Sequence, residues 1–364
     1  MMIGNKGEWS EIYALLKLLV DEEIYFGDEN QEKIPDAVLP IVSIVRKEPD
    51  YIAEYTYNGL QDENKEIVIS LGEGKNYSVP FKTFQDKTAE LLNEIKNGKG
   101  SFQIPGIKSF LNSFECTSIK AGSGSKSDIH VVVHDYKTGM HPELGFSIKS
   151  QLGGKSTLFN VSKSSAVTYK IQNFSHEKQE AVNAIDGSSK IRKRMAKILE
   201  LGAQIEFDEI KKPIFKNNLT IVDSMFPNLW AEMVKSYFLS EATKISEAVT
   251  WVCERNPNQY DKQNHHRFYE YKMKRLLNDM ALGMTSAKVW QGKYDATGGY
   301  LVVKSSGDIV CYHIYHRNSF DDYLFNYTSF DTPDPGPNKW NYGFVYEENG
   351  NFYIDLNAQI RFIH

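Results

Sequence analysis

The chain is poor in cysteine, and the cysteines it has are far apart. Cys116, Cys253 and Cys311 are the only three in 364 residues. An odd number at such wide spacing argues against a disulfide framework and against a zinc site built from paired cysteines. Free thiols at this frequency fit a protein kept in a reducing cytosol.

Long apolar runs are also missing. The stretch from Ile12 to Val20 is interrupted by Lys17 and flanked by acidic residues. No segment is long enough to span a bilayer, and the N-terminus lacks the pattern of a secretory signal peptide. The sequence therefore predicts a cytoplasmic protein with no membrane partner.

A nucleotide-binding loop is missing as well. The run Gly153-Gly-Lys-Ser-Thr157 is similar to the end of a P-loop, but the full motif needs a glycine five residues before Gly154. That position holds Lys149. An NTPase is therefore not expected.

No single charge sign is in strong excess, because 42 Lys and Arg residues face 47 Asp and Glu residues. The distribution is uneven: residues 1–100 carry a net charge of −8 and residues 301–364 carry −4, whereas residues 101–159 carry +2 and residues 160–300 carry +5. A positive middle between acidic ends is compatible with a phosphate-binding cleft. It is equally compatible with an ordinary solvated surface.

Two strand-like stretches hold the residues with the clearest chemistry. Residues 128–133 and 145–151 alternate apolar and polar positions, and about ten residues rich in turn formers join them. An antiparallel hairpin is the simple interpretation, and it would point Asp128 and Lys149 toward one face. A carboxylate beside an ammonium, where a divalent metal and a phosphate can sit, is the core of a metal-assisted nuclease. The alternative is a turn-capping aspartate and a lysine at an exposed edge.

Residues 6–23 predict an amphipathic helix, because apolar residues recur there at helical spacing. Glu8 and Glu11 lie three positions apart near its start and share a face. Acidic residues in a first turn also favour the helix dipole. A purely structural role therefore explains these two glutamates as well as a catalytic role does.

Taken together, these residues resemble the PD-(D/E)xK nuclease pattern, and the wider text resembles the HpaII-type restriction endonucleases. Five ordered blocks between residues 5 and 362 carry the resemblance: Asn5–Glu11, Gly145–Ser150, Ser156–Asn160, Tyr323–Asn326 with Asp331–Pro333, and Gln359–Phe362. The resemblance implies an α/β fold with a restriction-endonuclease-like core, a mixed central sheet flanked by helices.

The same resemblance suggests a division of the chain. Residues 1–175 would form the catalytic core, and residues 176–298 a helical region that contacts DNA. Residues 299–364 would form a β-rich C-terminal region that packs on the core and contributes to DNA recognition.

The function implied is that of a type II restriction endonuclease. Such an enzyme uses Mg²⁺ to hydrolyse phosphodiester bonds of double-stranded DNA at a short palindromic site, which is CCGG-like in named relatives. A homodimer is implied, because a two-fold protein matches a two-fold site. A bacterial cytoplasm and a cognate DNA methyltransferase as genetic partner are implied as well.

One position departs from the nuclease pattern, because Ser147 stands where a carboxylate is usual and a hydroxyl is a poor Mg²⁺ ligand. The resemblance assigns metal binding to Asp128 and the Ile148 carbonyl, with Glu11 preferred over Glu8 as the second acid. Glu11 is preferred because it completes a Gly-x-x-x-Glu spacing. One metal ion is the simpler expectation, and a second stays open.

The remaining catalytic roles follow the same pattern. Lys149 is expected to hold or help deprotonate the attacking water and to offset charge on the phosphorane. Gln151 shares the face of Lys149 and is expected to orient the phosphate, and Ser147 completes the catalytic set.

Candidate DNA contacts are basic and amide side chains, the types that bind phosphates and read base edges. They are Lys126, Lys155, Asn160, Lys193, Lys197, Arg317, Asn318 and Lys339. For Lys193 and Lys197, which share a helix face, an ordinary solvated surface is the alternative.

Two other functions remain open at this point. The first is a structure-specific or repair nuclease of the same fold. The second is a DNA-binding module whose catalytic site has decayed, which the serine at position 147 motivates. Cleavage of long duplex DNA into discrete fragments distinguishes a restriction enzyme from the first, and Mg²⁺-dependent cleavage distinguishes it from the second.

Overall fold

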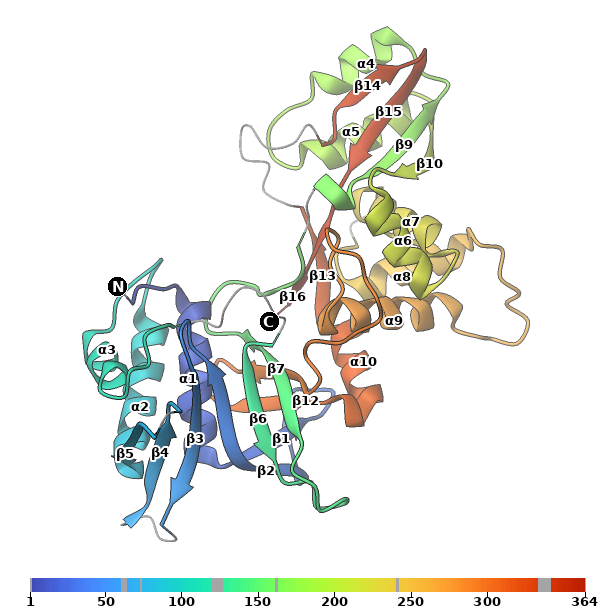
Figure 1. Ribbon diagram of the computed structural model, residues 1–364. Helices are drawn as coiled ribbons and strands as arrows, with labels where there is room; N and C mark the ends of the chain where they lie inside the picture. The colour runs from blue at the N-terminus through green and yellow to red at the C-terminus, as the bar shows by residue number, and fades with distance from the viewer. Residues whose placement is uncertain are drawn as a thin grey trace. The chain divides into compact units, whose positions relative to one another are not determined.

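The computed structural model describes residues 2–59, 64–72, 74–119, 127–160, 163–239, 242–332 and 342–363. The chain forms two compact units, and each is discontinuous in sequence (Figure 1). The first combines Met1–Ser156 with Tyr294–Tyr323, and the second combines Thr157–Lys293 with Leu324–Ile363. This grouping differs from the three consecutive regions predicted from the sequence, because strands late in the chain return to an early sheet.

The first unit is built on a nine-stranded sheet with the order β1-β12-β11-β7-β6-β2-β3-β4-β5. Its strands are β1 (Glu23–Gly27), β2 (Lys33–Lys47), β3 (Ile52–Asn58), β4 (Glu66–Ser70), β5 (Asn76–Pro80), β6 (Ile129–Val133), β7 (Glu143–Ser150), β11 (Gly299–Val303) and β12 (Ile309–Tyr312). The pairings are antiparallel except for β7 with β11 and β1 with β12, which are parallel. The fold is therefore mixed α/β with a mixed central sheet, as predicted.

The long strand β2 changes partners along its length. Residues 33–40 pair with β1, residues 41–45 pair with β6, and residues 44–47 pair with β3. Since β1 also pairs with β12, the strands β1, β12, β11, β7, β6 and β2 form a closed circuit of pairings. β6 and β7 thus lie inside a sheet and not at its edge.

The predicted hairpin is present, and its register places the candidate residues. β6 and β7 pair antiparallel, with Ile129 opposite Phe146 and Val131 opposite Leu144. These four side chains are buried in the core of the first unit. Since side chains alternate along a strand, Ser147 and Lys149 point to the opposite face of the sheet.

Helix α1 (Lys6–Asp21) begins at a capping box. The Asn5 side chain accepts a hydrogen bond from the Glu8 N–H at 3.1 Å, and the Glu8 carboxylate accepts one from the Asn5 N–H at 2.9 Å. These two bonds satisfy donors that a helix N-terminus otherwise leaves open. The helix ends at Glu22, which has a left-handed φ of 61°. The predicted helix over 6–23 is confirmed within two residues.

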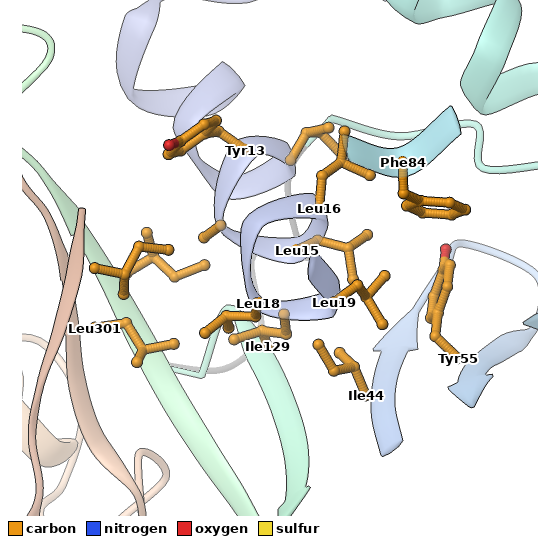
Figure 2. Close-up of a cluster of buried hydrophobic side chains, with 14 of the residues drawn as sticks. Tyr13, Leu15, Leu16, Leu18, Leu19, Ile44, Tyr55, Phe84, Ile129 and Leu301 are labelled. Carbon is orange, nitrogen blue, oxygen red and sulfur yellow. The ribbon is translucent and has the colours of Figure 1, made fainter. Parts of the chain in front are cut away.

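Helix α1 is buried around most of its circumference, between the sheet and α2 (Figure 2). Leu15, Leu16, Leu18 and Leu19 lie among side chains from several strands and from α2. Each buried leucine contributes about 1.5–3 kcal/mol of transfer free energy. This contact fixes the helix relative to β6 and β7. The other helices of the first unit are α2 (Phe81–Asn97), α3 (Pro105–Asn112) and most of α10 (Arg317–Asn326).

The second unit contains two small sheets and six helices within its described residues. The sheets have the orders β10-β9-β15-β14 and β13-β16-β8. Their strands are β8 (Thr157–Phe159), β9 (Val167–Gln172), β10 (Gln204–Ile210), β13 (Thr328–Asp331), β14 (Val345–Glu348), β15 (Asn351–Leu356) and β16 (Gln359–Phe362). The helices are α4 (His176–Asn183), α5 (Lys190–Glu200), α6 (Pro213–Val222), α7 (Phe226–Leu239), α8 (Ile245–Arg255) and α9 (Phe268–Leu282).

The sequence alone favours a strand over residues 116–119. The structure has none there, because the N–H groups of Thr117 and Ser118 donate to a carboxylate instead of a strand partner. Among its described residues, the region 176–298 that was predicted to be helical holds the helices α4 to α9 and one strand, β10, which pairs with β9.

The described part of the chain contains no helix long and apolar enough to cross a membrane. Cys116 and Cys311 are buried free thiols, and Cys253 is an exposed one.

Candidate active site

Asp128 lies immediately before β6 and is held against β7. Its backbone N–H donates to the Phe146 carbonyl at 2.8 Å. Its carboxylate oxygen Oδ2 accepts from the Ile148 N–H at 2.7 Å and from the Ser147 hydroxyl at 3.2 Å. Both side-chain bonds fall on Oδ2, and within the described residues Oδ1 has no hydrogen-bond donor. One carboxylate oxygen is thus oriented by protein and the other is left for a ligand.

Lys149 lies two residues beyond Ser147 on the same face of β7. Its ammonium lies over the Tyr300 ring, with Nζ 5.0 Å from the ring centroid. Burial lowers the pKa of Lys149 below its ordinary value, although the nearby carboxylates of Asp128 and Glu11 raise it. A lysine with a depressed pKa gives up its proton more readily than an ordinary lysine does.

The two glutamates of α1 have different surroundings. Glu8 is part of the capping box with Asn5, so its carboxylate is used to begin the helix. Glu11 is half-buried, and its charge, like that of Asp128, raises the pKa of Lys149. The next residue toward the N-terminus, Ser10, bonds to Ser150 of β7 at 2.7 Å between hydroxyl oxygens. This bond ties the first turns of α1 to the strand that carries Lys149.

Two further candidates point to protein partners. The Ser147 side chain is buried, and its hydroxyl donates to Asp128. The Gln151 side-chain amide donates to the side-chain oxygen Oε1 of Gln31 at 2.6 Å. Ser147 therefore orients the carboxylate of Asp128, and Gln151 is itself oriented by the turn that holds Gln31.

The donor set fits Mg²⁺ in chemistry, though not as a closed cage. Among the residues described, no three His, Cys, Asp or Glu side chains cluster closely enough to hold a metal. Mg²⁺ commonly keeps several waters and is bound through one or two carboxylates together with substrate phosphates. Asp128, with an open Oδ1, and Glu11 supply two carboxylates of that kind.

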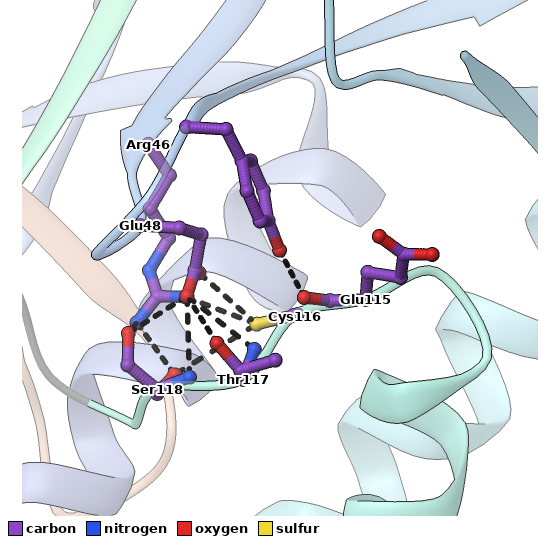
Figure 3. A network of polar contacts seen from close by, with 7 residues as sticks. Arg46, Glu48, Glu115, Cys116, Thr117 and Ser118 are labelled. Carbon is purple, nitrogen blue, oxygen red and sulfur yellow. Dashed lines mark hydrogen bonds and ion pairs between the residues drawn. The ribbon is translucent and has the colours of Figure 1, made fainter.

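A buried charge network lies on β2, the strand beside β6 (Figure 3). The Arg46 and Glu48 side chains form an ion pair, and these residues are only 4 % and 2 % exposed. Arg46 also donates to the Ser118 carbonyl at 2.8 Å and to the Cys116 sulfur at 3.0 Å. Glu48 accepts from the Ser118 N–H at 3.2 Å and hydroxyl at 2.9 Å. The pair anchors the segment that precedes Asp128 by about ten residues in the sequence.

The network also reaches the candidate site electrostatically. Burial lowers the pKa of the Arg46 guanidinium, but the groups around it outweigh burial and raise the pKa above its ordinary value. Cys116 and Glu48 contribute most to this rise, and Glu11 contributes least. Burial raises the pKa of the Cys116 thiol to about 12, so this cysteine stays protonated and unreactive.

Replacing Arg46 by methionine is expected to lower the free energy of unfolding by about 3–5 kcal/mol, because it leaves the Glu48 charge buried and unpaired. The midpoint of urea denaturation measures this loss. Arg46→Met combined with Glu48→Gln removes the unpaired charge and should recover part of it.

The matched control is Lys82→Met, which breaks the exposed pair of Lys82 and Asp86, 2.9 Å apart. This change should leave the midpoint unaltered, since exposed pairs contribute little. Equal midpoints for Arg46→Met and the wild type would show that the buried pair does not hold the fold.

The predicted DNA contacts are scattered over both units. Lys155, Asn160, Lys193, Arg317 and Asn318 are exposed, and Lys197 pairs with Glu200 at 2.7 Å. Arg317 also has an acidic neighbour, Asp321, at 3.7 Å. Lys126 and Lys339 lie outside the described residues. The structure thus leaves the predicted DNA contacts untested.

Sequence reasoning missed three residues that surround the site. Tyr300 of β11 pairs with Ser147 of β7. This pairing is parallel, and no local sequence pattern predicts it. Ser10 lies among the buried apolar residues of α1, and no sequence pattern marked it as part of the site. Arg46 could have been found from the sequence, because it is a charged residue at a position that continues the inward-facing alternation of Ile44 in β2.

Comparison with known proteins places the whole chain in one family. The family model described as HpaII restriction endonuclease matches residues 5–362. The type II restriction enzyme HpaII of Haemophilus parainfluenzae is 45 % identical over 362 residues, which cover 99 % of this chain and 98 % of that enzyme. No solved structure matches the chain. The resemblance predicted from five blocks of sequence is confirmed.

Proposed function

Because the chain belongs to the HpaII restriction endonuclease family, we propose that it is a type II restriction endonuclease, a site-specific deoxyribonuclease acting on double-stranded DNA. The observation that carries the proposal is the full-length match to a type II restriction enzyme at 45 % identity. The site geometry agrees with it, since an acid before β6 and a lysine in β7 lie beside an acid on α1.

The first unit is the restriction-endonuclease-like core in this proposal. Its support is the succession of α1 with Glu11, β6 preceded by Asp128, and β7 with Lys149, all around one sheet. This is the order of acid, acid and lysine in the nuclease pattern to which the sequence is similar.

Asp128 and Glu11 would hold Mg²⁺, together with the Ile148 carbonyl. When bound, the metal polarises the scissile phosphate and lowers the pKa of a bound water. Ser147 and the Ile148 N–H keep the Asp128 carboxylate in place, as their bonds to Oδ2 indicate. Lys149 orients the attacking water and accepts its proton when neutral, or offsets phosphate charge when protonated. Gln151 donates one amide N–H to Gln31, and its second amide N–H would orient the phosphate.

The wider properties of the enzyme belong to the same proposal. The target is a short palindrome, CCGG-like as in named relatives, and the active form is a homodimer because a two-fold site needs two copies of the core. A methyltransferase that modifies the same site is the genetic partner. The exposed basic and amide residues named above supply contacts to phosphates and base edges.

Digestion of a mapped phage DNA tests the function directly. With Mg²⁺ the protein should produce a fixed set of fragments, and sequencing their ends should reveal one short palindrome. With EDTA no fragments should form. Cleavage only of branched or damaged DNA would instead indicate a repair nuclease, and DNA binding without cleavage in any divalent metal would indicate a decayed site.

We expect the Mg²⁺ requirement of cleavage to change in Glu11→Gln but not in Glu8→Gln. Glu11→Gln removes a metal-binding carboxylate and should raise the Mg²⁺ concentration for half-maximal cleavage by about 10- to 100-fold. Glu8→Gln keeps an oxygen that can accept from the Asn5 N–H, so it should preserve the capping box and leave that concentration nearly unaltered. Single-turnover cleavage across a Mg²⁺ series distinguishes the two. A stronger Mg²⁺ effect of Glu8→Gln would transfer the metal-binding role to that residue.

A further inference from the structure

The hairpin of β6 and β7 carries a second group of titratable side chains at its tip, away from Asp128. His134 follows β6 and His141 precedes β7, and they face each other with His134 Nδ1 and His141 Nε2 3.0 Å apart. Their ring centroids are 4.9 Å apart and the rings are tilted by 37°. His134 is six residues from Asp128, which corresponds to about 20 Å along an extended strand.

The backbone of the tip is held by several hydrogen bonds, so the two rings are kept close together before any ligand arrives. The Asp135 N–H donates to the Met140 carbonyl at 3.0 Å, and the Gly139 N–H donates to the Asp135 carbonyl at 2.7 Å. The Asp135 carboxylate accepts from the Lys137 N–H and from the Thr138 hydroxyl, each at 2.9 Å. The His134 N–H donates to Pro40 of β2 at 2.9 Å, which ties the tip to the rest of the sheet.

Such a pair has the spacing of a bidentate metal ligand. With metal–nitrogen bonds of about 2.05 Å, as zinc makes with histidine, 3.0 Å between the nitrogens corresponds to an N–metal–N angle of about 94°. An angle near 90° suits the square-planar and tetragonal sites of Cu²⁺ and Ni²⁺ better than tetrahedral Zn²⁺. Neutral imidazole binds these metals, whereas Mg²⁺ prefers oxygen.

We propose that His134 and His141 form a surface binding site for a late first-row divalent metal, Ni²⁺ or Cu²⁺, separate from the catalytic site. In the metal-free pair, one facing nitrogen carries the proton of the hydrogen bond. On binding, that ring changes tautomer and carries its proton on the distant nitrogen, and each lone pair turns by about 43° from the line that joins the two nitrogens, toward the metal. No proton is lost in this step, and water fills the remaining coordination positions.

The partners of the pair are consistent with this role. The Tyr136 ring stands edge-on to His134, with centroids 4.8 Å apart, and limits its rotation. His141 is exposed, so a metal can approach from solvent. His130 lies four residues before His134 on the same face, and Glu143 lies two residues after His141. These two side chains bond to each other at 3.0 Å and are not needed as ligands.

The test is calorimetric titration of Ni²⁺ into untagged full-length protein. We expect one Ni²⁺ per chain at this site, and His134→Gln and His141→Gln should each weaken binding at least about tenfold, because even outer-shell partners of a metal contribute that much. Ni²⁺ should also raise the melting temperature of the wild type but not of these variants, since a ligand that binds only the folded state stabilises it.

His265→Gln is the control, because His265 is an exposed histidine of the second unit outside the pair. It should bind Ni²⁺ as the wild type does, and all variants should cleave DNA normally with Mg²⁺. Equal Ni²⁺ affinity in the wild type, His134→Gln and His141→Gln would overturn the proposal, and so would the absence of measurable binding to the wild type.

Discussion

Asp128→Asn is expected to abolish cleavage while DNA binding is retained. The amide oxygen of asparagine can still accept from Ser147 and from the Ile148 N–H, so the local structure should persist. The negative charge that holds the metal is lost, and with it several kcal/mol of transition-state stabilisation. We expect the single-turnover rate to fall by about 1,000-fold or more, which corresponds to about 4 kcal/mol.

Two measurements complete this test. A gel-shift titration in Ca²⁺ or EDTA should give nearly the same DNA affinity as the wild type. Ser147→Ala keeps the charge and removes one bond to Oδ2, so it should lower the rate by only about tenfold, the equivalent of one hydrogen bond. Cleavage by Asp128→Asn at close to the wild-type rate would remove this residue from the mechanism.

Lys149→Met should likewise reduce cleavage by about 1,000-fold, because it removes both the candidate general base and a positive charge beside the phosphate. The burial that lowers the pKa of Lys149 increases the fraction of neutral amine at a given pH. If the neutral amine accepts the proton of water, the wild-type rate should rise with pH through this pKa. A pH–rate profile under single-turnover conditions shows the rise.

Lys149→Arg separates the two roles of Lys149. Arginine stays protonated, so it can offset charge but cannot act as a base. An activity of Lys149→Arg well above that of Lys149→Met, with no rise toward high pH, would assign an electrostatic role. Lys137→Met is the control, since this exposed lysine lies at the hairpin tip, and it should cleave normally.

Local patterns in the sequence were sufficient to predict the hairpin and the first helix. Alternation placed Asp128 and Lys149 on neighbouring strands, and the observed register confirms that β6 and β7 pair antiparallel. The parallel neighbour β11 could not be predicted, because its pairing with β7 joins residues far apart in the chain and leaves no local pattern. The strand that the sequence favours over 116–119 does not form for a related reason, since its backbone N–H groups donate to Glu48, the residue that follows β2.

The candidate site shows the same limit. The Gly-x-x-x-Glu spacing favoured Glu11 and kept Glu8 as the second choice, and the sequence did not show that the Glu8 carboxylate bonds to the Asn5 N–H in a capping box. The partner of Gln151 is Gln31, a buried residue in a turn more than a hundred positions earlier. Roles that depend on distant partners of this kind are fixed by the fold, and the spacing of residues along one strand does not reveal them.

The position of β11 has a consequence for how the protein is made. A growing chain that has passed Ser150 already contains Asp128 and Lys149, yet β7 then has a partner on one side only. Its second partner, with Tyr300 beneath the lysine, emerges only after the long segment Thr157–Lys293 of the second unit has been translated. Closing so long a segment is slow and costs chain entropy. A nascent or prematurely ended chain should therefore be unable to cut the DNA of its own cell, and activity should begin only once translation is almost complete.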